Sequence, residues 1–301
     1  MIVTSLSALR PASCRAIIVN ISTKEVTTLA MSSVLRHSQL PILLIDMQSI
    51  DGSWEYFSRM ASSEPRIDLY SAPLMKHGYI LDRIFKETRD ERLLLVDSDL
   101  EICDSRIVNQ MLEATVEEDV FGAGAIHGPS WLGSAHNLPK NVVLYQERMW
   151  IPITMLRVRH IKAALDEGYS FINRWVPNEV TAVPWLSKLL SMRFFVPVIK
   201  RIRAECLRGT RSTYHNERPN MVCCDTGADI FCHLKYDKGA CFVDYGIDSL
   251  TTLAHHYHGV TRRRLNRRDN NATAIDDIMG EVLERLKQEY GIEFEHSSRA
   301  R

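Results

Sequence analysis

The chain has 301 residues with 37 basic and 37 acidic side chains, so its formal net charge is zero, and hydrophobic residues make up 45% of it. These values match an average globular protein and exclude an intrinsically disordered chain, a collagen and a coiled coil. Without a basic excess the chain is not expected to bind nucleic acid, and its length predicts one large α/β domain or two fused halves.

The first 130 residues alternate between short apolar runs and segments with helical spacing of apolar residues. Strands are expected at 16–19, 41–45, 67–70, 93–96 and 120–123. Helices are expected between them, at 25–36, 53–61, 78–88 and 105–117. Regular alternation of this kind predicts an α/β, Rossmann-like fold, with a mostly parallel central sheet and helices on both faces.

Four carboxylates follow the ends of two expected strands. Asp46 and Asp51 come after the second strand, and Asp97 and Asp99 come directly after the fourth. Ligands of open parallel sheets bind beyond the carboxyl ends of the strands. We therefore expect these four side chains along one functional edge of the sheet.

The second half of the chain is less regular. A helix is expected at 225–236 and a strand at 240–243. Near the C-terminus an amphipathic helix is predicted from apolar residues at helical spacing, namely Ile275, Ile278, Met279, Val282, Leu283 and Leu286.

The strongest chemical signal is the segment 93–99, which reads Leu-Leu-Leu-Val-Asp-Ser-Asp. Two carboxylates one residue apart at a strand end can share a hard divalent cation. Mn²⁺ and Mg²⁺ prefer oxygen ligands and keep coordination positions open for substrate phosphates. The alternative is a solvated turn in which an aspartate caps the next helix. The predicted cofactor is Mn²⁺ or Mg²⁺, held by Asp97 and Asp99.

A second segment, 45–53, reads Ile-Asp-Met-Gln-Ser-Ile-Asp-Gly-Ser and closely resembles the VDNGSTDGS stretch of nucleotide-sugar glycosyltransferases with the GT-A fold, in particular the large inverting family 2 type. The resemblance extends upstream, where 19–21 and 32–35 are similar to the family's first strand and first helix. It extends downstream to Lys76-His77-Gly78, where the family has a short glycine-containing turn before its DxD strand.

Later segments resemble the same family in the same order. Residues 155–157 are similar to its acceptor-side strand, 225–239 to its ED helix, and 255–262 to its terminal H-x-x-G-x-S segment. One departure concerns the family's Glu-Asp pair, because Cys224 precedes Asp225 here.

The resemblance implies a GT-A fold and a metal-dependent transfer of a sugar from a nucleotide-diphosphate donor, with a UDP-sugar as first candidate. The acceptor would be a saccharide or lipid-linked saccharide, and the transfer would invert the anomeric carbon. The implied donor-binding residues are Asp46, Asp51, Lys76, Asp97 and Arg262.

Asp225 is the predicted general base, because the acceptor hydroxyl must lose a proton as it attacks. The alternative is that Asp225 caps a helix. His258, one of three histidines within 255–258, is the predicted third metal ligand, against the alternative of a structural side chain. Arg262 begins an arginine-rich run, 262–268, that either forms a solvated face or binds phosphates or anionic headgroups.

The predicted parts are a nucleotide-sugar-binding half at 1–130, an acceptor-binding and catalytic half at 131–265, and a C-terminal helix and tail at 266–301. The seven cysteines show no CxxC spacing, which indicates free thiols in a reducing compartment. The sequence shows neither the apolar core of a signal peptide nor a transmembrane run. A cytoplasmic location is expected, with peripheral membrane contact left open.

Two alternatives remain at this point. A haloacid-dehalogenase-like phosphatase would use Asp97 as nucleophile and Asp244 and Asp248 as its later acidic pair, but it leaves Asp46 and Asp51 without a role. A GT-A protein that binds ligands without catalysing transfer is the non-enzymatic alternative. Failure to bind Mn²⁺ and any nucleotide would favour a non-catalytic protein.

Overall fold

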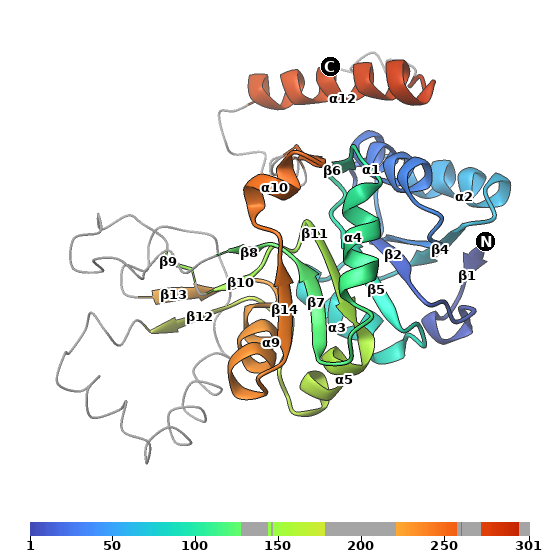
Figure 1. The fold of residues 1–301 in the computed structure, drawn as a ribbon. Coiled ribbons are helices and arrows are strands. Elements are labelled where there is room, and N and C mark those ends of the chain that lie inside the picture. The colour runs from blue at the N-terminus through green and yellow to red at the C-terminus, as the bar shows by residue number, and fades with distance from the viewer. Residues whose placement is uncertain (128–143, 146, 178–220, 258–259, 261–271, 295–301) are drawn as a thin grey trace.

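The computed structural model describes residues 1–127, 144–145, 147–177, 221–257, 260 and 272–294 (Figure 1). Its centre is an eight-stranded sheet. From one edge to the other the strands are β1 (Ile2–Val3), β4 (Ile67–Ser71), β3 (Ile42–Asp46), β2 (Arg15–Asn20), β5 (Arg92–Val96), β11 (Ile153–Arg157), β7 (Val120–Gly124) and β14 (Cys241–Asp244). All neighbours pair in parallel except β11, which is antiparallel to both β5 and β7.

Alternate residues of the central strands face two separate apolar cores. Ile17 of β2 belongs to one core, whereas its neighbours Ala16 and Ile18 belong to the other. The strands read as nearly continuous apolar runs because helices cover both faces of the sheet. One core includes α3 (His77–Glu87), α5 (Val158–Asp166) and α9 (Ala228–Cys232). The other includes α1 (Lys24–His37), α2 (Ser53–Ser63), α4 (Arg106–Ala114) and α10 (Ile247–Thr251).

Three small sheets lie beside the central one. Strand β6 (Leu100–Ile102) pairs antiparallel with β15 (Ala254–His256), and β8 (Ile126–His127) pairs antiparallel with β10 (Arg148–Met149). The third contains β12 (Arg174–Pro177), β13 (Met221–Cys224) and β9 (Leu144–Tyr145). The remaining short elements are the 3-10 helix η1 (Leu6–Ala8) and the π-helical turn η2 (His233–Asp237).

The C-terminal helix α12 (Ala272–Tyr290) packs against α1, in line with its predicted amphipathic pattern. Val282 and Leu286 of α12 are fully buried against Val26 and Leu29 of α1. Figure 1 shows α12 as a separate layer over α1, beyond the carboxyl end of the central strands. This contact brings the helix α12 to the edge where the candidate site lies.

The predicted fold class is confirmed: the chain is α/β, with a mostly parallel sheet and helices on both faces. Each strand and helix expected within the first 130 residues is present, whereas the short strands β1, β6 and β8 were not predicted. The central sheet takes β11 and β14 from the second half of the chain, so the predicted halves share one sheet.

Among the described residues, no helix combines the length and apolar character needed to cross a bilayer.

Candidate functional site

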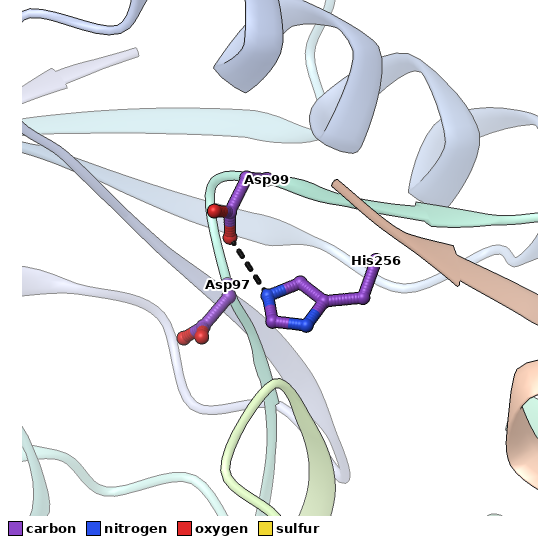
Figure 2. Close-up of side chains that lie close together, drawn as sticks. All are labelled: Asp97, Asp99 and His256. Atoms are coloured by element: carbon purple, nitrogen blue, oxygen red, sulfur yellow. Dashed lines mark hydrogen bonds and ion pairs between the residues drawn. The ribbon is translucent and has the colours of Figure 1, made fainter. Parts of the chain in front are cut away.

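The candidate site forms where β5 ends and the chain turns into β6. Asp97 and Asp99 occupy this turn, and His256 approaches them from the end of β15 (Figure 2). His256 Nε2 lies 3.1 Å from Asp99 Oδ1. One ligand atom from each of the three residues falls within 4.8 Å of the other two. In the part of the chain that the structure describes, this is the one group of three or more acidic, histidine or cysteine side chains with such spacing.

These distances fit a divalent cation. Two ligand atoms that each lie about 2.1 Å from an octahedral ion, at a right angle to one another, are about 3 Å apart. The Nε2–Oδ1 separation of 3.1 Å is therefore the separation that two neighbouring ligands of one ion would have. Two carboxylates and one imidazole form a donor set that suits Mn²⁺, and three protein ligands would leave three positions of an octahedral ion for other oxygen ligands.

Neighbouring groups hold the Asp99 and His256 side chains in place. Both side chains are largely buried, with exposed fractions of 9% and 12%. The backbone N–H of Val260 donates to Asp99 Oδ2 over 3.3 Å. The Trp150 ring meets the His256 ring edge to face, with centroids 5.8 Å apart. The imidazole thus has one nitrogen near the carboxylate and an aromatic side chain packed against its ring.

The predicted donor-side residue Asp46 lies at the carboxyl end of β3, two strands from β5. Its carboxylate is 2% exposed and accepts hydrogen bonds from Asn20 Nδ2 at 2.7 Å and from the Ser49 N–H at 3.1 Å. Ser22 and Gln48, in the two adjoining loops, have positive φ angles of 51° and 54°. Asp46 therefore holds two bent loops together at the edge where a ligand of a parallel sheet would bind.

Asp51 joins the starts of two helices. Its carboxylate accepts the backbone N–H of Lys24 at the first turn of α1 and the N–H and hydroxyl of Ser53 at the start of α2. Lys76 is exposed and directly precedes α3, beyond the end of β4. Strand spacing places the ends of β3 and β4 about 10 and 14 Å from the end of β5. All four predicted carboxylates thus follow strands at one edge of the sheet, as expected.

Asp225, the predicted base, precedes α9 and forms an ion pair with Arg148 of β10, with Nε and Oδ2 3.3 Å apart. Its carboxylate also accepts the N–H of Thr226 at 2.8 Å. Arg148 is only two residues before Trp150, a distance of about 7 Å along an extended chain. Trp150 in turn contacts His256, so a short chain of contacts links Asp225 to the candidate metal site.

Two neighbours of Asp225 have shifted pKa values. Burial lowers the pKa of His127, and the nearby Arg148 lowers it further, against the opposing charge of Asp225. Burial raises the pKa of Asp229, one turn after Asp225, although the Arg174 guanidinium that contacts it acts in the opposite direction. Two carboxylates near the start of α9, Asp225 and Asp229, are therefore each paired with a different arginine.

Two predicted site residues, His258 and Arg262, lie outside the described residues. The structure brings a different histidine, His256, to the aspartate pair. The cluster of three histidines within 255–258 indicated this segment, but spacing alone did not distinguish among its members. Asn20 was not predicted as a site residue at all, since a polar residue at the end of a strand carries no distinctive pattern.

No protein-family model matches the chain, and no curated protein matches its sequence. Solved structures with a similar arrangement include TarS 1–349 of S. aureus, at 13% identity and a TM-score of 0.38, over 54% of this chain and 50% of TarS. The mannosyltransferase PcManGT from Pyrobaculum calidifontis, solved with GDP-Man and Mn²⁺, has 11% identity and a TM-score of 0.41, over 96% of this chain and 84% of its own. A 4-diphosphocytidyl-2C-methyl-D-erythritol synthase from Anaerococcus prevotii has 10% identity and a TM-score of 0.35, over 52% of this chain and 76% of its own. The match thus spans half the length of the TarS 1–349 chain.

Proposed function

We propose that this chain is a metal-dependent glycosyltransferase of the GT-A type, and that it moves a sugar from a nucleotide-diphosphate donor to a saccharide or lipid-linked saccharide. The observation that carries this proposal is the group of Asp97, Asp99 and His256 at the carboxyl end of β5. A UDP-sugar is the first donor candidate, and the family 2 resemblance of the sequence favours inversion.

The side chains support a division of roles. A divalent ion bound by Asp97, Asp99 and His256 would supply the positive charge that a leaving nucleoside diphosphate requires. Asp46, held by Asn20 and Ser49, shapes the edge of the sheet where the nucleoside would lie.

Asp225 is the proposed general base. Its carboxylate is 19% exposed, so an acceptor hydroxyl can reach it, and its ion pair with Arg148 orients it. Asp51, Lys76 and Arg262 remain proposed donor contacts, and His258 a proposed additional ligand.

The parts of the chain follow from these roles. We propose residues 1–130 as the donor-binding half, 131–265 as the acceptor-binding half and 266–301 as a C-terminal helix and tail. A cytoplasmic location with peripheral membrane contact fits a lipid-linked acceptor.

The position of Asp244 argues against the phosphatase alternative. That mechanism needs Asp244 and Asp248 close to Asp97. Asp244 ends β14, three strands from β5 in the sheet, which is about 14 Å. Its carboxylate accepts the N–H groups of Ile126 and Gly246 instead.

A thermal-shift screen tests the proposal. The full chain is heated with UDP, GDP, CDP and ADP, each with and without Mn²⁺, and with the matching monophosphates. Binding to the native state raises the melting temperature, by an amount equivalent to about 2.7 kcal/mol at a ligand concentration 100 times Kd. We expect one diphosphate to stabilise the chain only when Mn²⁺ is present. If no nucleotide and no divalent ion raises the melting temperature, the proposal is wrong; binding without donor turnover would favour the non-catalytic protein.

A further inference from the structure

A buried carboxylate, Glu101, lies two residues after Asp99 on the strand β6. Glu101 is 1% exposed and receives hydrogen bonds from three side chains. The Tyr257 hydroxyl lies 3.2 Å from Oε2 and the Tyr290 hydroxyl 2.9 Å from Oε1. Arg285 Nε lies 3.0 Å from Oε1 and 3.2 Å from Oε2. None of these contacts is needed for the chemistry proposed above.

The partners of Glu101 come from two other segments of the chain. Arg285 and Tyr290 belong to the C-terminal helix α12, and Tyr257 directly follows β15. A buried carboxylate is costly unless hydrogen bonds and an opposite charge compensate it. Glu101 therefore fixes α12 and the end of β15 against β6, because the compensation is lost when either segment moves away.

Glu101 is connected to the ligands of the candidate metal site by two short routes. Along β6, only Leu100 separates Glu101 from Asp99. Across the strand pair, Tyr257 donates its hydroxyl to Glu101 and its backbone N–H to the carbonyl oxygen of Asp99, the latter over 2.8 Å. Tyr257 is also the neighbour of His256, so one residue contacts both Glu101 and Asp99 and carries the ligating histidine beside it.

The helix α12 supports the same segment through apolar contacts. Tyr257 and Val260 pack in one cluster with Val282 and Leu286 of α12. The backbone N–H of Val260 is the group that donates to Asp99 Oδ2. The packing of α12 and the hydrogen bonds to Glu101 therefore act on Tyr257 and Val260. His256, the neighbour of Tyr257, and the Val260 N–H are the two groups that reach the Asp99 carboxylate.

We propose that Glu101 is a positioning residue of the metal site and that α12 acts through it to hold His256 beside Asp99. This inference rests on the proposed metal site and adds to it a requirement for the C-terminal helix. It differs from a purely structural role for Glu101, because it predicts a loss of metal affinity in variants that are still folded.

The test is a titration of the full chain with Mn²⁺, in which the electron paramagnetic resonance signal reports the concentration of free ion. It is carried out at a temperature where circular dichroism shows each protein to be folded. Glu101→Gln keeps the size of the side chain and removes its charge. We expect its Kd for Mn²⁺ to rise at least about tenfold, as for other residues that support metal ligands. Tyr290→Phe removes one hydroxyl and keeps the ring, and we expect a rise of about threefold.

Tyr245→Phe is the matched control. It also removes one tyrosine hydroxyl, which donates to the Gln110 carbonyl oxygen at 2.9 Å and not to Glu101. Its Kd for Mn²⁺ should equal that of the wild type. If Glu101→Gln does not fold, the test is the Kd for Mn²⁺ of Tyr290→Phe compared with that of Tyr245→Phe.

The outcomes separate this inference from the proposed function. If the wild type binds Mn²⁺ and the folded variants Tyr290→Phe and Glu101→Gln bind it with the same Kd, only the positioning role of Glu101 is wrong. A wild type that does not bind Mn²⁺ overturns the metal site and this inference together.

Discussion

His256 Nε2 and Asp99 Oδ1 lie 3.1 Å apart, although 157 positions separate the two residues in the chain. The antiparallel pairing of β15 with β6 brings them together, with His256 opposite Leu100. A hydrogen bond or a shared cation can occupy this separation, and the nearby Asp97 carboxylate favours the cation. The adjacent histidine, His255, packs against the Tyr257 ring and is 54% exposed, and it serves as a comparison.

The first prediction compares the two histidines. His256→Ala should weaken Mn²⁺ binding by at least about tenfold, because it removes a ligand atom. His255 is 54% exposed and lies 3.9 Å from Glu281, so His255→Ala should leave the affinity unchanged. Isothermal titration with Mn²⁺ measures both. If both variants lose the same Mn²⁺ affinity, the two histidines affect binding through the stability of the fold, and His256 is not a metal ligand.

The second prediction separates the two aspartates. Asp99 accepts hydrogen bonds from His256 and from the Val260 backbone, so Asp99→Asn should lower both Mn²⁺ affinity and the melting temperature. Asp97 is less buried, and Asp97→Asn should lower the affinity with a smaller change in melting temperature. The double variant should lose Mn²⁺-dependent nucleotide binding and keep its circular dichroism spectrum. Mn²⁺ affinity that survives in the double variant would remove these residues from the metal site.

The third prediction concerns the pH dependence of stability. Burial raises the pKa of Asp82 above its ordinary value of 3.8, against hydrogen bonds from Ser170 and the Phe171 N–H. The folded state therefore holds this proton more tightly than the unfolded state. The stability that the proton contributes is fully present below pH 3.8 and is lost as the pH rises through the higher folded-state pKa.

Asp82→Asn imitates the protonated acid, which allows the effect to be isolated by urea unfolding between pH 3 and pH 7. The unfolding free energy of the wild type minus that of Asp82→Asn should fall as the pH rises. Asp104 is the control of opposite sign, because hydrogen bonds from Arg106 lower its pKa. The unfolding free energy of the wild type minus that of Asp104→Asn should therefore rise with pH. A difference for Asp82 that does not vary with pH contradicts the prediction.

The fourth prediction compares two glycines in helices. A Cβ at Gly78 would lie 2.5 Å from the Phe171 carbonyl oxygen and 2.6 Å from the Ile172 Cα. These are backbone atoms, which cannot shift without straining the fold, so Gly78→Ala should lower the unfolding free energy by about 1–3 kcal/mol. Gly280, in the exposed middle of α12, has no atom within 4 Å of such a Cβ. Gly280→Ala should therefore stabilise the protein by up to about 1 kcal/mol, which urea unfolding can measure.

Local periodicity was sufficient to predict most of the sheet. In a continuous apolar run such as 93–96, side chains on both faces of the strand are apolar, which predicts a sheet covered by helices on both faces. The alternation of such runs with helices along the chain indicated parallel pairing. The direction of β11 could not be predicted in this way. Its sequence, Ile-Thr-Met-Leu-Arg, is compatible with either direction, and the long-range pairing with β5 determines the outcome.

Residues of the candidate site could be predicted only where they follow the end of a strand. Asp97 and Asp99 had that context, whereas the role of His256 depends on β15 pairing with β6 in one register. Glu101 alternates with Leu100 and Ile102, a pattern that ordinarily predicts an exposed side chain. It is buried because α12, nearly two hundred residues later, supplies Arg285 and Tyr290 to cover it.

The last prediction concerns the proposed base. Asp225 is oriented by Arg148 at 3.3 Å and by the Thr226 N–H, and a carboxylate in this position can accept a proton from an acceptor hydroxyl. Asp225→Asn keeps the shape of the side chain and removes its basicity. Turnover, measured as release of the nucleoside diphosphate from the donor found in the thermal-shift screen, should fall by about 10²–10⁴-fold.

Binding of the nucleoside diphosphate should be nearly unchanged in Asp225→Asn, because Asp225 is not among the residues proposed to hold the metal or the nucleoside. Asp229→Asn is the control: this carboxylate is buried against Arg174, and its loss leaves a partly buried guanidinium without its charge partner. We expect Asp229→Asn to lower the melting temperature and to affect turnover only in proportion to the unfolded fraction. If instead donor affinity falls as much as turnover in Asp225→Asn, Asp225 acts on the donor side or on the fold, and Asp229 becomes the better candidate for the base.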